Sequence, residues 1–427
     1  MTRFVTGFGK VAVYTRIAAT VALRYALRPA CFGWSPIAYL RFLRRALILL
    51  LVFRHNKVVR VATGYKLHLY LPAFPTPAFY HAIESKLIST PARATTVVLS
   101  MTKACSYKCA HCYQRKDTGP DLDEPLLIDT AQAMQDDGVA FFDIEGGEPI
   151  MRFDRLLNLV RALDDRSEIW VNTTGAGLTS EMLNQLKQSG LCGLMISVHS
   201  PDPSIHDALT GVEGSFDTAC EALRMCREAG LAAAVNCVLS ESELREGGLA
   251  NLMDLARELG ADFVQLIHPK PAGMWIGRED QMQQDPEVLA LVRQEHVRFN
   301  SSAMRGYPAL AAQAFEESES VLGCTCGGID RFYLNATGEV QPCEFVNLSF
   351  GNVRQEPFEV IYRRMREFFP DPRTDWMCST LAARIDSAFR EHGLTQTPLP
   401  WEITRALIEG CERGDPTPIY EKLGIYK

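Results

Sequence analysis

Six short runs of β-forming residues recur between residues 96 and 268, and amphipathic stretches of helical period separate them. Runs of about four to eight such residues predict strands, whereas apolar residues spaced three or four positions apart predict helices. Strands that alternate with helices form a parallel sheet, and six such units in series predict a sheet that curls toward a barrel. In such a sheet the loops after the strand C-termini hold the chemistry. The fold class is therefore α/β, a partial (β/α)6 TIM-like barrel with strands expected at residues 96–102, 139–145, 168–173, 193–199, 231–239 and 263–268.

Three cysteines crowd into the loop after the first predicted strand. The segment CSYKCAHCY places three residues between Cys105 and Cys109 and two between Cys109 and Cys112. Such crowding does not suit disulfides, and the basic N-terminus lacks the features of a secretory signal, so we expect a reducing compartment. Three thiolates at this spacing predict an iron-sulfur cluster with one iron left open. A zinc site completed by His111 is the alternative.

The pattern C-x-x-x-C-x-aromatic-C after the first strand of a six-unit barrel resembles the radical S-adenosylmethionine (SAM) superfamily. The resemblance implies an oxygen-sensitive [4Fe-4S] cluster on Cys105, Cys109 and Cys112, whose open iron binds SAM. It also implies reductive cleavage of SAM to methionine and a 5′-deoxyadenosyl radical, which abstracts hydrogen from the substrate. A flavodoxin- or ferredoxin-like protein is the expected electron donor, under anaerobic conditions. No catalytic acid, base or radical-quenching residue is assigned from the sequence.

Residues at the ends of later strands match positions that contact SAM in that superfamily. EGGEP follows the second strand and is similar to the GGEP element, and the next three strands end in NTTG, ISVHS and VNCV. Two departures stand out: NTTG replaces the more usual Thr-Asn-Gly, and His199 replaces an Asp. His199 is either a substrate acid-base group or a hydrogen-bonded core histidine. The resemblance implies cofactor contacts from His111, Gly146, Gly147, Glu148, Asn172, Thr174, Ser197 and Asn236.

A second group of cysteines lies in the C-terminal third of the chain. The segment FYLNATGEVQPC predicts a hairpin with its turn at residues 335–338. The spacing around it resembles the first half of a SPASM or twitch domain, which binds auxiliary [4Fe-4S] clusters. The later dense cysteine group of a full SPASM domain is absent from the sequence, so a single auxiliary cluster is the most implied, and a hairpin without metal is the alternative. The implied ligands are Cys324, Cys326, Cys343 and Cys378.

The N-terminal segment has an unbalanced charge. Twelve Lys and Arg precede residue 84, whereas all 51 acidic residues lie from Glu84 onward. Two basic amphipathic helices are expected in residues 1–58, broken around Pro29 to Pro36, and the apolar run from Ala46 to Phe53 is too short to span a bilayer. The mixture favours an anionic membrane surface as partner over nucleic acid. A helix that caps the catalytic domain is the alternative.

These observations predict a four-part chain with a function in radical chemistry. The leading hypothesis is a radical SAM enzyme that abstracts hydrogen from a membrane-associated lipid or isoprenoid-like substrate, in the cytoplasm at the inner face of the cell membrane. The alternative is a peptide-modifying or sulfatase-maturing radical SAM/SPASM enzyme. The expected parts are an arm, a strand and Pro-rich connector, the barrel, and a SPASM/twitch-like and helical region, at residues 1–58, 59–95, 96–300 and 301–427.

Overall fold

The six predicted strands form the centre of one curved parallel sheet. The computed structural model describes residues 3–278, 285–409, 411 and 415–426. Every predicted strand is present, shifted by no more than two residues at either end, because each run of β-forming residues is flanked by turn residues. The strands lie side by side in chain order and comprise β4 (Thr96–Ser100), β5 (Phe141–Glu145), β6 (Glu168–Thr173), β7 (Leu191–Ser197), β8 (Ala232–Val238) and β9 (Phe263–Ile267).

Three further strands extend the sheet without closing it. At one edge β10 (Ala309–Ala312) pairs in parallel with β9, and at the other β11 (Arg331–Leu334) pairs in parallel with β4. The strand β12 (Val340–Gln341) pairs antiparallel with β11, as expected for the hairpin. Since β10 and β12 are the two ends of the strand order, the barrel is partial, and the predicted class is confirmed.

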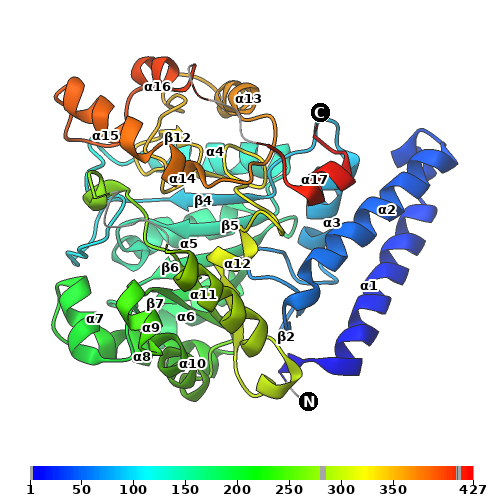
Figure 1. Cartoon of the computed structure of the whole chain (residues 1–427), viewed down its shortest axis with the longest axis horizontal. Helices are drawn as coiled ribbons and strands as arrows, with labels where there is room; N and C mark the ends of the chain where they lie inside the picture. Colours follow the sequence, from blue (N-terminus) through cyan, green and yellow to red (C-terminus); the bar gives the residue numbers. More distant parts are fainter. Residues whose placement is uncertain (1–2, 279–284, 410, 412–414, 427) are drawn as a thin grey trace.

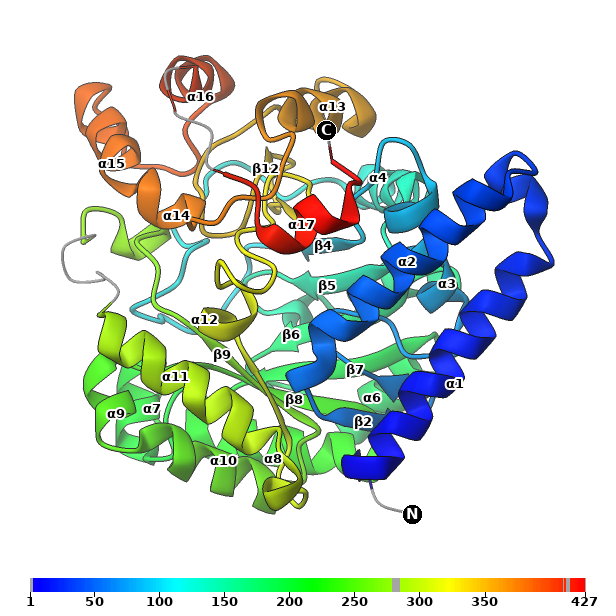
Figure 2. The ribbon, with the colours of Figure 1, turned by 45° about the vertical axis from the view of Figure 1, so that its right-hand side comes forward.

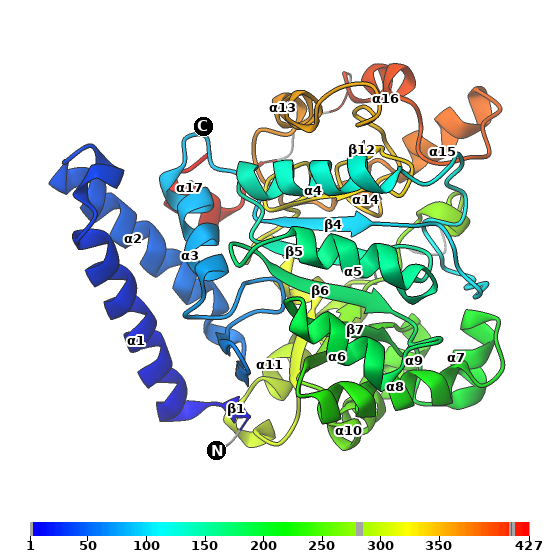
Figure 3. The ribbon, with the colours of Figure 1, turned by 180° about the vertical axis from the view of Figure 1, so that it is seen from behind.

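Helices cover the convex side of the sheet, as Figures 1 and 3 show. Side-chain caps start several of them, since Asp123 accepts a hydrogen bond from the Leu126 amide and Thr179 accepts one from the Met182 amide. One or two α-helices lie in each connection between successive strands from β4 to β11. They are α4 (Glu124–Asp137), α5 (Phe153–Ala162), α6 (Ser180–Gln188), α7 (Pro203–Thr210), α8 (Ser215–Ala229), α9 (Glu241–Arg245), α10 (Gly248–Leu259), α11 (Pro286–Phe299) and α12 (Gln313–Glu316).

The concave side of the sheet changes from apolar to polar along the strands. Phe141 and Trp170 point to this side near the strand beginnings and are fully buried. Because side chains alternate along a strand, residues two and four positions further along face the same side. Those positions carry Asp143, Glu145 and Asn172. The sequence thus fills the lower barrel with hydrophobic side chains and leaves polar groups at its upper edge.

The N-terminal segment forms a helical hairpin beside the barrel. The helices α1 (Gly7–Ala26) and α2 (Pro36–Val52) run antiparallel, and α1 is the outermost of the two (Figure 2). Their inner sides pack on a hydrophobic cluster that includes α3 (Pro77–Ile83). In the described chain, no helix is both long enough and apolar enough to cross a bilayer.

The connector expected at residues 59–95 begins with two short strands, and the prediction of one strand there is wrong. A turn after Val61 divides the segment into β2 (Val58–Val61) and β3 (Gly64–Lys66), which pair antiparallel, and β1 (Phe4–Val5) adds to β2. The division occurs where Gly64 approaches the backbone of Phe74 so closely that a Cβ would lie 2.1 Å from the carbonyl oxygen.

The C-terminal third packs over the upper edge of the sheet next to β11 and β12 (Figure 1). Its helices are short and joined by irregular loops, one of which carries Cys324 and Cys326. They are α13 (Phe358–Phe368), α14 (Met377–Thr380), α15 (Ala382–Glu391), α16 (Trp401–Ile408) and α17 (Pro418–Leu423).

Candidate active site

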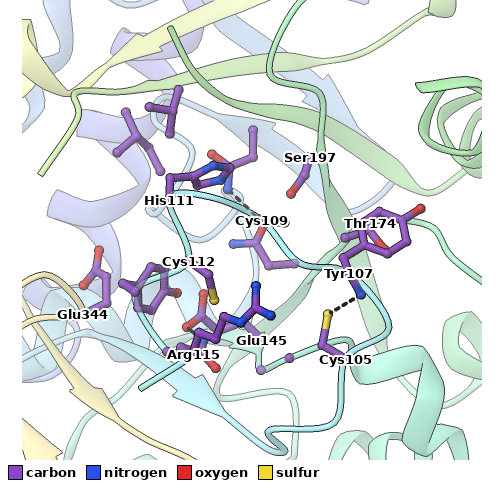
Figure 4. Close-up of a pocket in the computed structure, with 18 of the residues that line it drawn as sticks. Cys105, Tyr107, Cys109, His111, Cys112, Arg115, Glu145, Thr174, Ser197 and Glu344 are labelled. Carbon is purple, nitrogen blue, oxygen red and sulfur yellow. Dashed lines mark hydrogen bonds between the residues drawn. The ribbon is translucent and has the colours of Figure 1, made fainter. Parts of the chain in front are cut away.

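The polar end of the concave side opens into a cavity of about 500 Å³. Figure 4 shows that its walls come from the loop after β4 and from the ends of the neighbouring strands. Small-molecule sites in proteins commonly have volumes of about 300–1,000 Å³. All but one of the residues predicted to hold the first cluster and SAM line this one space. They are Cys105, Cys109, His111, Cys112, Gly146, Gly147, Asn172, Thr174, Ser197 and Asn236.

The cysteine loop has no regular secondary structure but is held at several points. The amides of Lys108 and Ala110 donate to the carbonyls at the end of α7, at 3.0 Å each. The Cys112 carbonyl accepts a hydrogen bond of 3.1 Å from the Met274 amide. Because these bonds come from segments far apart in the sequence, the loop conformation depends on the assembled barrel.

The three thiols of this loop share one environment. Burial raises the pKa of Cys109 to about 12 and that of Cys112 to about 11, and the neighbouring thiols add to the effect on Cys109. The guanidinium of Arg115 opposes this shift at Cys105 and Cys109. Without a bound cation the thiols are therefore protonated at neutral pH, whereas a positively charged ligand would favour the thiolates.

Two glycines allow the loop after β5 to pack directly against the cysteine loop. A Cβ on Gly147 would lie 2.3 Å from the carbonyl oxygen of Ala104, and one on Gly146 would lie 2.5 Å from that of Thr102. The Gly147 amide donates to the Thr102 carbonyl at 2.7 Å. Glycine is needed here because any side chain would push these backbones apart.

Glu148 differs from the other predicted contacts, since it is buried and does not line the cavity. Its carboxylate accepts hydrogen bonds from the Thr173 hydroxyl at 2.7 Å and from the Thr174 hydroxyl and amide at 2.6 and 2.8 Å. It also accepts one from the Ile150 amide at 3.1 Å. The side chain thus ties the ends of β5 and β6 together, and its contact with SAM stays a prediction.

The polar residues on β6, β7 and β8 form one side of the cavity. The Asn236 side-chain amide donates to the side-chain oxygen Oδ1 of Asn172 at 3.1 Å. The Oδ1 atom of Asn236 itself is buried without a hydrogen-bond partner. Figure 4 shows Ser197 and Thr174 along the same wall. Buried polar atoms normally have a partner, so an unpaired acceptor in a cavity indicates a place for a ligand.

His199 lies deep in the cavity, against His111. The two ring centroids are 4.4 Å apart, and the His199 amide donates to Nδ1 of His206. Burial and the neighbouring imidazoles hold the pKa of His199 well below its usual range, so the ring is neutral at pH 7. Its Nδ1 atom is buried and has no hydrogen-bond partner.

Sequence reasoning missed a group of buried acids in the cavity wall. Asp143 and Glu145 lie on β5, and Glu344 follows the β11–β12 hairpin. Burial and the nearby Glu344 raise the pKa of Asp143 to about 7, and burial and Asp143 raise that of Glu145 well above its usual range. Two acids in the otherwise apolar FFDIE run were the available signal, because an unpaired buried carboxylate is costly.

The four cysteines of the C-terminal group come together, although the first and the last are 54 positions apart in the sequence. All four are buried. The sulfurs of Cys324 and Cys326 lie 3.1 Å apart, and the charge of Cys378 contributes to the raised pKa of Cys343. The Met377 amide donates to Cys324 at 3.5 Å, which joins α14 to the loop that carries Cys324 and Cys326.

The residues of the first site fit a cluster with SAM. Three thiols and a cation line a cavity of suitable size that also holds unpaired acceptors. Within the described ranges, no three His, Cys, Asp or Glu side chains are arranged around a single metal ion.

The comparisons with known families agree with this chemistry. Residues 99–245 match the radical SAM superfamily, and residues 324–380 match SPASM, an iron-sulfur cluster-binding domain. The two matches contain the two cysteine groups. The first therefore coincides with the barrel strands β5 to β8, and the second with the hairpin and α14.

Similar curated proteins carry different activities. The chain is 27% identical to an AdoMet-dependent heme synthase of Nitratidesulfovibrio vulgaris, across 64% of this chain and 79% of that protein. It is 28% identical to a PqqA peptide cyclase of Streptomyces rochei, across 67% and 81%. A probable GTP 3′,8-cyclase of Sulfurisphaera tokodaii is 27% identical, across 57% and 79%. The three relatives are named for different reactions, so they support the class of enzyme and not one particular reaction.

Solved structures support the fold. SuiB of Streptococcus suis bound to S-adenosylmethionine superposes with a TM-score of 0.52 at 19% identity, across 63% of this chain and 65% of that one. The family matches, the cavity and the fold lead to one conclusion. The chain belongs to the radical SAM superfamily, as an enzyme that uses a [4Fe-4S] cluster and SAM, and it carries a SPASM-type iron-sulfur cluster-binding region.

Proposed function

We propose that Cys105, Cys109 and Cys112 hold the [4Fe-4S] cluster and that the enzyme abstracts hydrogen from a membrane-associated, lipid-like substrate. The observation that carries the first part is that the three thiols line one cavity together with unpaired polar atoms. When bound and reduced, the cluster and SAM supply a 5′-deoxyadenosyl radical. Every radical SAM enzyme needs a reductant, and we propose a flavodoxin- or ferredoxin-like donor under anaerobic conditions.

The cavity residues have distinct proposed tasks toward SAM. The unpaired Oδ1 of Asn236 can accept from a ligand hydroxyl or ammonium group, and Ser197 and Thr174 offer hydroxyls along the same wall. Asn172 holds Asn236 in place through its carbonyl oxygen. Gly146 and Gly147 let the loop after β5 pack against the cysteine loop, and the His111 ring presents a flat face for a base.

The direct test of this chemistry is the formation of 5′-deoxyadenosine. The reconstituted protein is mixed anaerobically with SAM and dithionite, and the products are separated by liquid chromatography. A radical SAM enzyme forms 5′-deoxyadenosine, and Cys109→Ala should abolish it. Product formed equally by Cys109→Ala, or none by the wild type, would contradict the proposed cluster site.

We further propose that Cys324, Cys326, Cys343 and Cys378 hold one auxiliary cluster. Four buried thiols suffice for the four irons of a cubane cluster. The support is the hydrogen bond between α14 and the Cys324 loop, together with the charge interactions of Cys378 with Cys324 and Cys343. A closed set of four ligands leaves no iron open, so this cluster would carry electrons rather than bind SAM.

The helical hairpin supports the membrane-associated part of the proposal. Its outer side chains include apolar residues in water, such as Phe8 at 95% exposure and Trp34 at 75%. Neither helix contains an acidic residue, and the exposed arginines are Arg16, Arg28, Arg41, Arg44 and Arg54. Exposed apolar side chains among cations are typical of helices that bind an anionic lipid surface. The inner side of the same hairpin packs on the connector and on Val321, Leu322, Ile419 and Ile425.

Vesicle binding separates these roles of the hairpin. We expect Leu27→Ser, Trp34→Ser and Ile37→Ser, combined in the full-length protein, to reduce co-sedimentation with vesicles that contain phosphatidylglycerol. Each exposed apolar side chain that enters the interface contributes about 1.5–3 kcal/mol at most when fully buried. The loss should therefore exceed tenfold.

A matched triple variant serves as the control for vesicle binding. Met151, Ile205 and Val360 are also exposed apolar residues, but they lie on the barrel and the C-terminal region. Their replacement by Ser should leave co-sedimentation unchanged. Equal binding by the hairpin variant and the wild type would exclude membrane docking through this surface.

Peptide modification is the second candidate, because a relative is named PqqA peptide cyclase and is 28% identical. The two candidates differ in the substrate that should increase the rate of SAM cleavage. Lipid extract from the source cells should increase 5′-deoxyadenosine formation under the first proposal. An increase with synthetic precursor peptides, and none with lipid extract, would favour the second.

A further inference from the structure

A buried lysine lies between the two cysteine groups. Lys270 follows β9, lines the main cavity and is 4% exposed. Its Nζ atom is buried and has no hydrogen-bond partner. A buried ammonium group without a partner is costly, and proteins normally avoid one unless a negative charge lies close by.

The surroundings of Lys270 include the segment that carries Cys378 and the carboxylate of Glu317. The Nζ atom lies 3.2 Å from the ring centroid of Trp376, two residues before Cys378. Burial lowers the pKa of Lys270, and the charges of Cys378, Glu317, Cys343 and Cys324 oppose that effect. Three of the four opposing groups are therefore thiols of the auxiliary site.

The other cation near these cysteines is compensated in a different way. Arg331 forms an ion pair with Glu317 at 2.7 Å, and Glu344 also stabilises its charge. This ion pair with Arg331 engages the carboxylate of Glu317. The charge of Lys270 thus has no carboxylate paired with it among the described residues.

We propose that Lys270 tunes the auxiliary cluster, holding its reduction potential up by placing an unpaired positive charge beside the cysteines that bind it. The inference deepens the proposed function, because it rests on the auxiliary ligand set given above. Reduction adds one negative charge to a cluster, so a buried cation stabilises the reduced cluster more than the oxidised cluster. Lys270 is a positioning and tuning residue and binds no iron itself.

The potential can be measured on a full-length protein that holds only the auxiliary cluster. Cys105, Cys109 and Cys112 are replaced by Ala in this parent, which is reconstituted anaerobically and titrated with dithionite while EPR spectra are recorded. Lys270→Met should shift the oxidised-to-reduced equilibrium at least tenfold toward the oxidised form, which is a drop of about 59 mV for one electron. Lys270→Arg keeps the charge and should stay within threefold of the parent.

Lys57→Met is the matched control for loss of a buried lysine. The Lys57 Nζ atom donates to the carbonyls of Met304 and Tyr307, at 2.8 and 2.7 Å, on the side of the N-terminal hairpin. Its potential should equal that of the parent. An oxidised-to-reduced equilibrium for Lys270→Met that stays within threefold of the equilibrium of the parent would overturn the proposal.

Two further outcomes are also decisive. If Lys270→Met binds no iron, Lys270→Arg decides, because a normal potential there supports a role for charge and a failed assembly or a shifted potential refutes it. If the parent itself binds no iron, the auxiliary ligand set is wrong and the Lys270 proposal falls with it. Failure of the ligand set is thus seen as missing iron, and failure of the lysine proposal as an intact cluster with an unchanged potential.

Discussion

Replacing Asp143 by Asn should stabilise the cofactor-free protein, by an amount that grows with pH. Burial raises the pKa of Asp143 to about 7 in the folded protein, whereas an unfolded Asp ionises near about 3.9. A carboxyl group whose folded pKa is raised favours folding only while it stays protonated. Its contribution is fully present below the unfolded pKa and is lost as pH rises through the folded pKa.

The magnitude follows from the separation of the two pKa values. A difference of about three units corresponds to roughly 4 kcal/mol, at about 1.4 kcal/mol per unit. Asn does not titrate and can keep the weak contacts that Tyr70 and Asn172 make with this position. The variant should therefore gain about 1.5 kcal/mol at pH 5 and roughly 4 kcal/mol at pH 8 relative to wild type.

Urea denaturation of the anaerobic, iron-free proteins at pH 5, 6, 7 and 8 measures this gain. Asp202→Asn is the control, since Asp202 caps α7 in water and hydrogen bonds from Ser204 lower its pKa. Asn is also a good cap, so that variant should show no gain that grows with pH. A gain for Asp143→Asn that is the same at pH 5 and pH 8 would refute the assignment of a protonated, buried Asp143.

Two other substitutions test the architecture of the two cysteine groups. Gly147→Ala should lower the free energy of unfolding by about 1–3 kcal/mol and reduce the iron bound at the first site, because its Cβ would collide with the Ala104 carbonyl. Gly306→Ala is the control, since its Cβ would lie in open space. That variant should change neither the free energy of unfolding in denaturation assays nor the iron content in iron assays. Cys378→Ala should remove the auxiliary iron measured by colorimetric assay and Cys411→Ala should not, so equal iron in both variants would exclude Cys378 as a ligand.

Much of the barrel could be predicted because its signals are local. Each strand from β4 to β9 is a continuous run of β-forming residues, and each is flanked by turn or cap residues. The strand β10 was missed since its sequence, ALAA, consists of residues that favour helices. Only its pairing with β9 makes it a strand. Tertiary contacts overrode local propensity there.

The site was predictable in its membership but not in its internal contacts. Motif positions placed ten residues around one cavity, because the C-terminal ends of parallel strands share one edge of the sheet. The orientation of Glu148 toward Thr173 and Thr174 depends on how β5 and β6 pack, which no spacing encodes. The position of Lys270 beside Cys378 likewise arises only from the folded chain.

Iron content together with SAM cleavage tests the central claim most directly. Wild-type protein and the Cys109→Ala variant are purified anaerobically, iron and sulfide are counted, and 5′-deoxyadenosine is measured after reduction with SAM present. The account predicts about four fewer irons per chain in the variant and no 5′-deoxyadenosine. Equal iron and equal 5′-deoxyadenosine in the two proteins would contradict it.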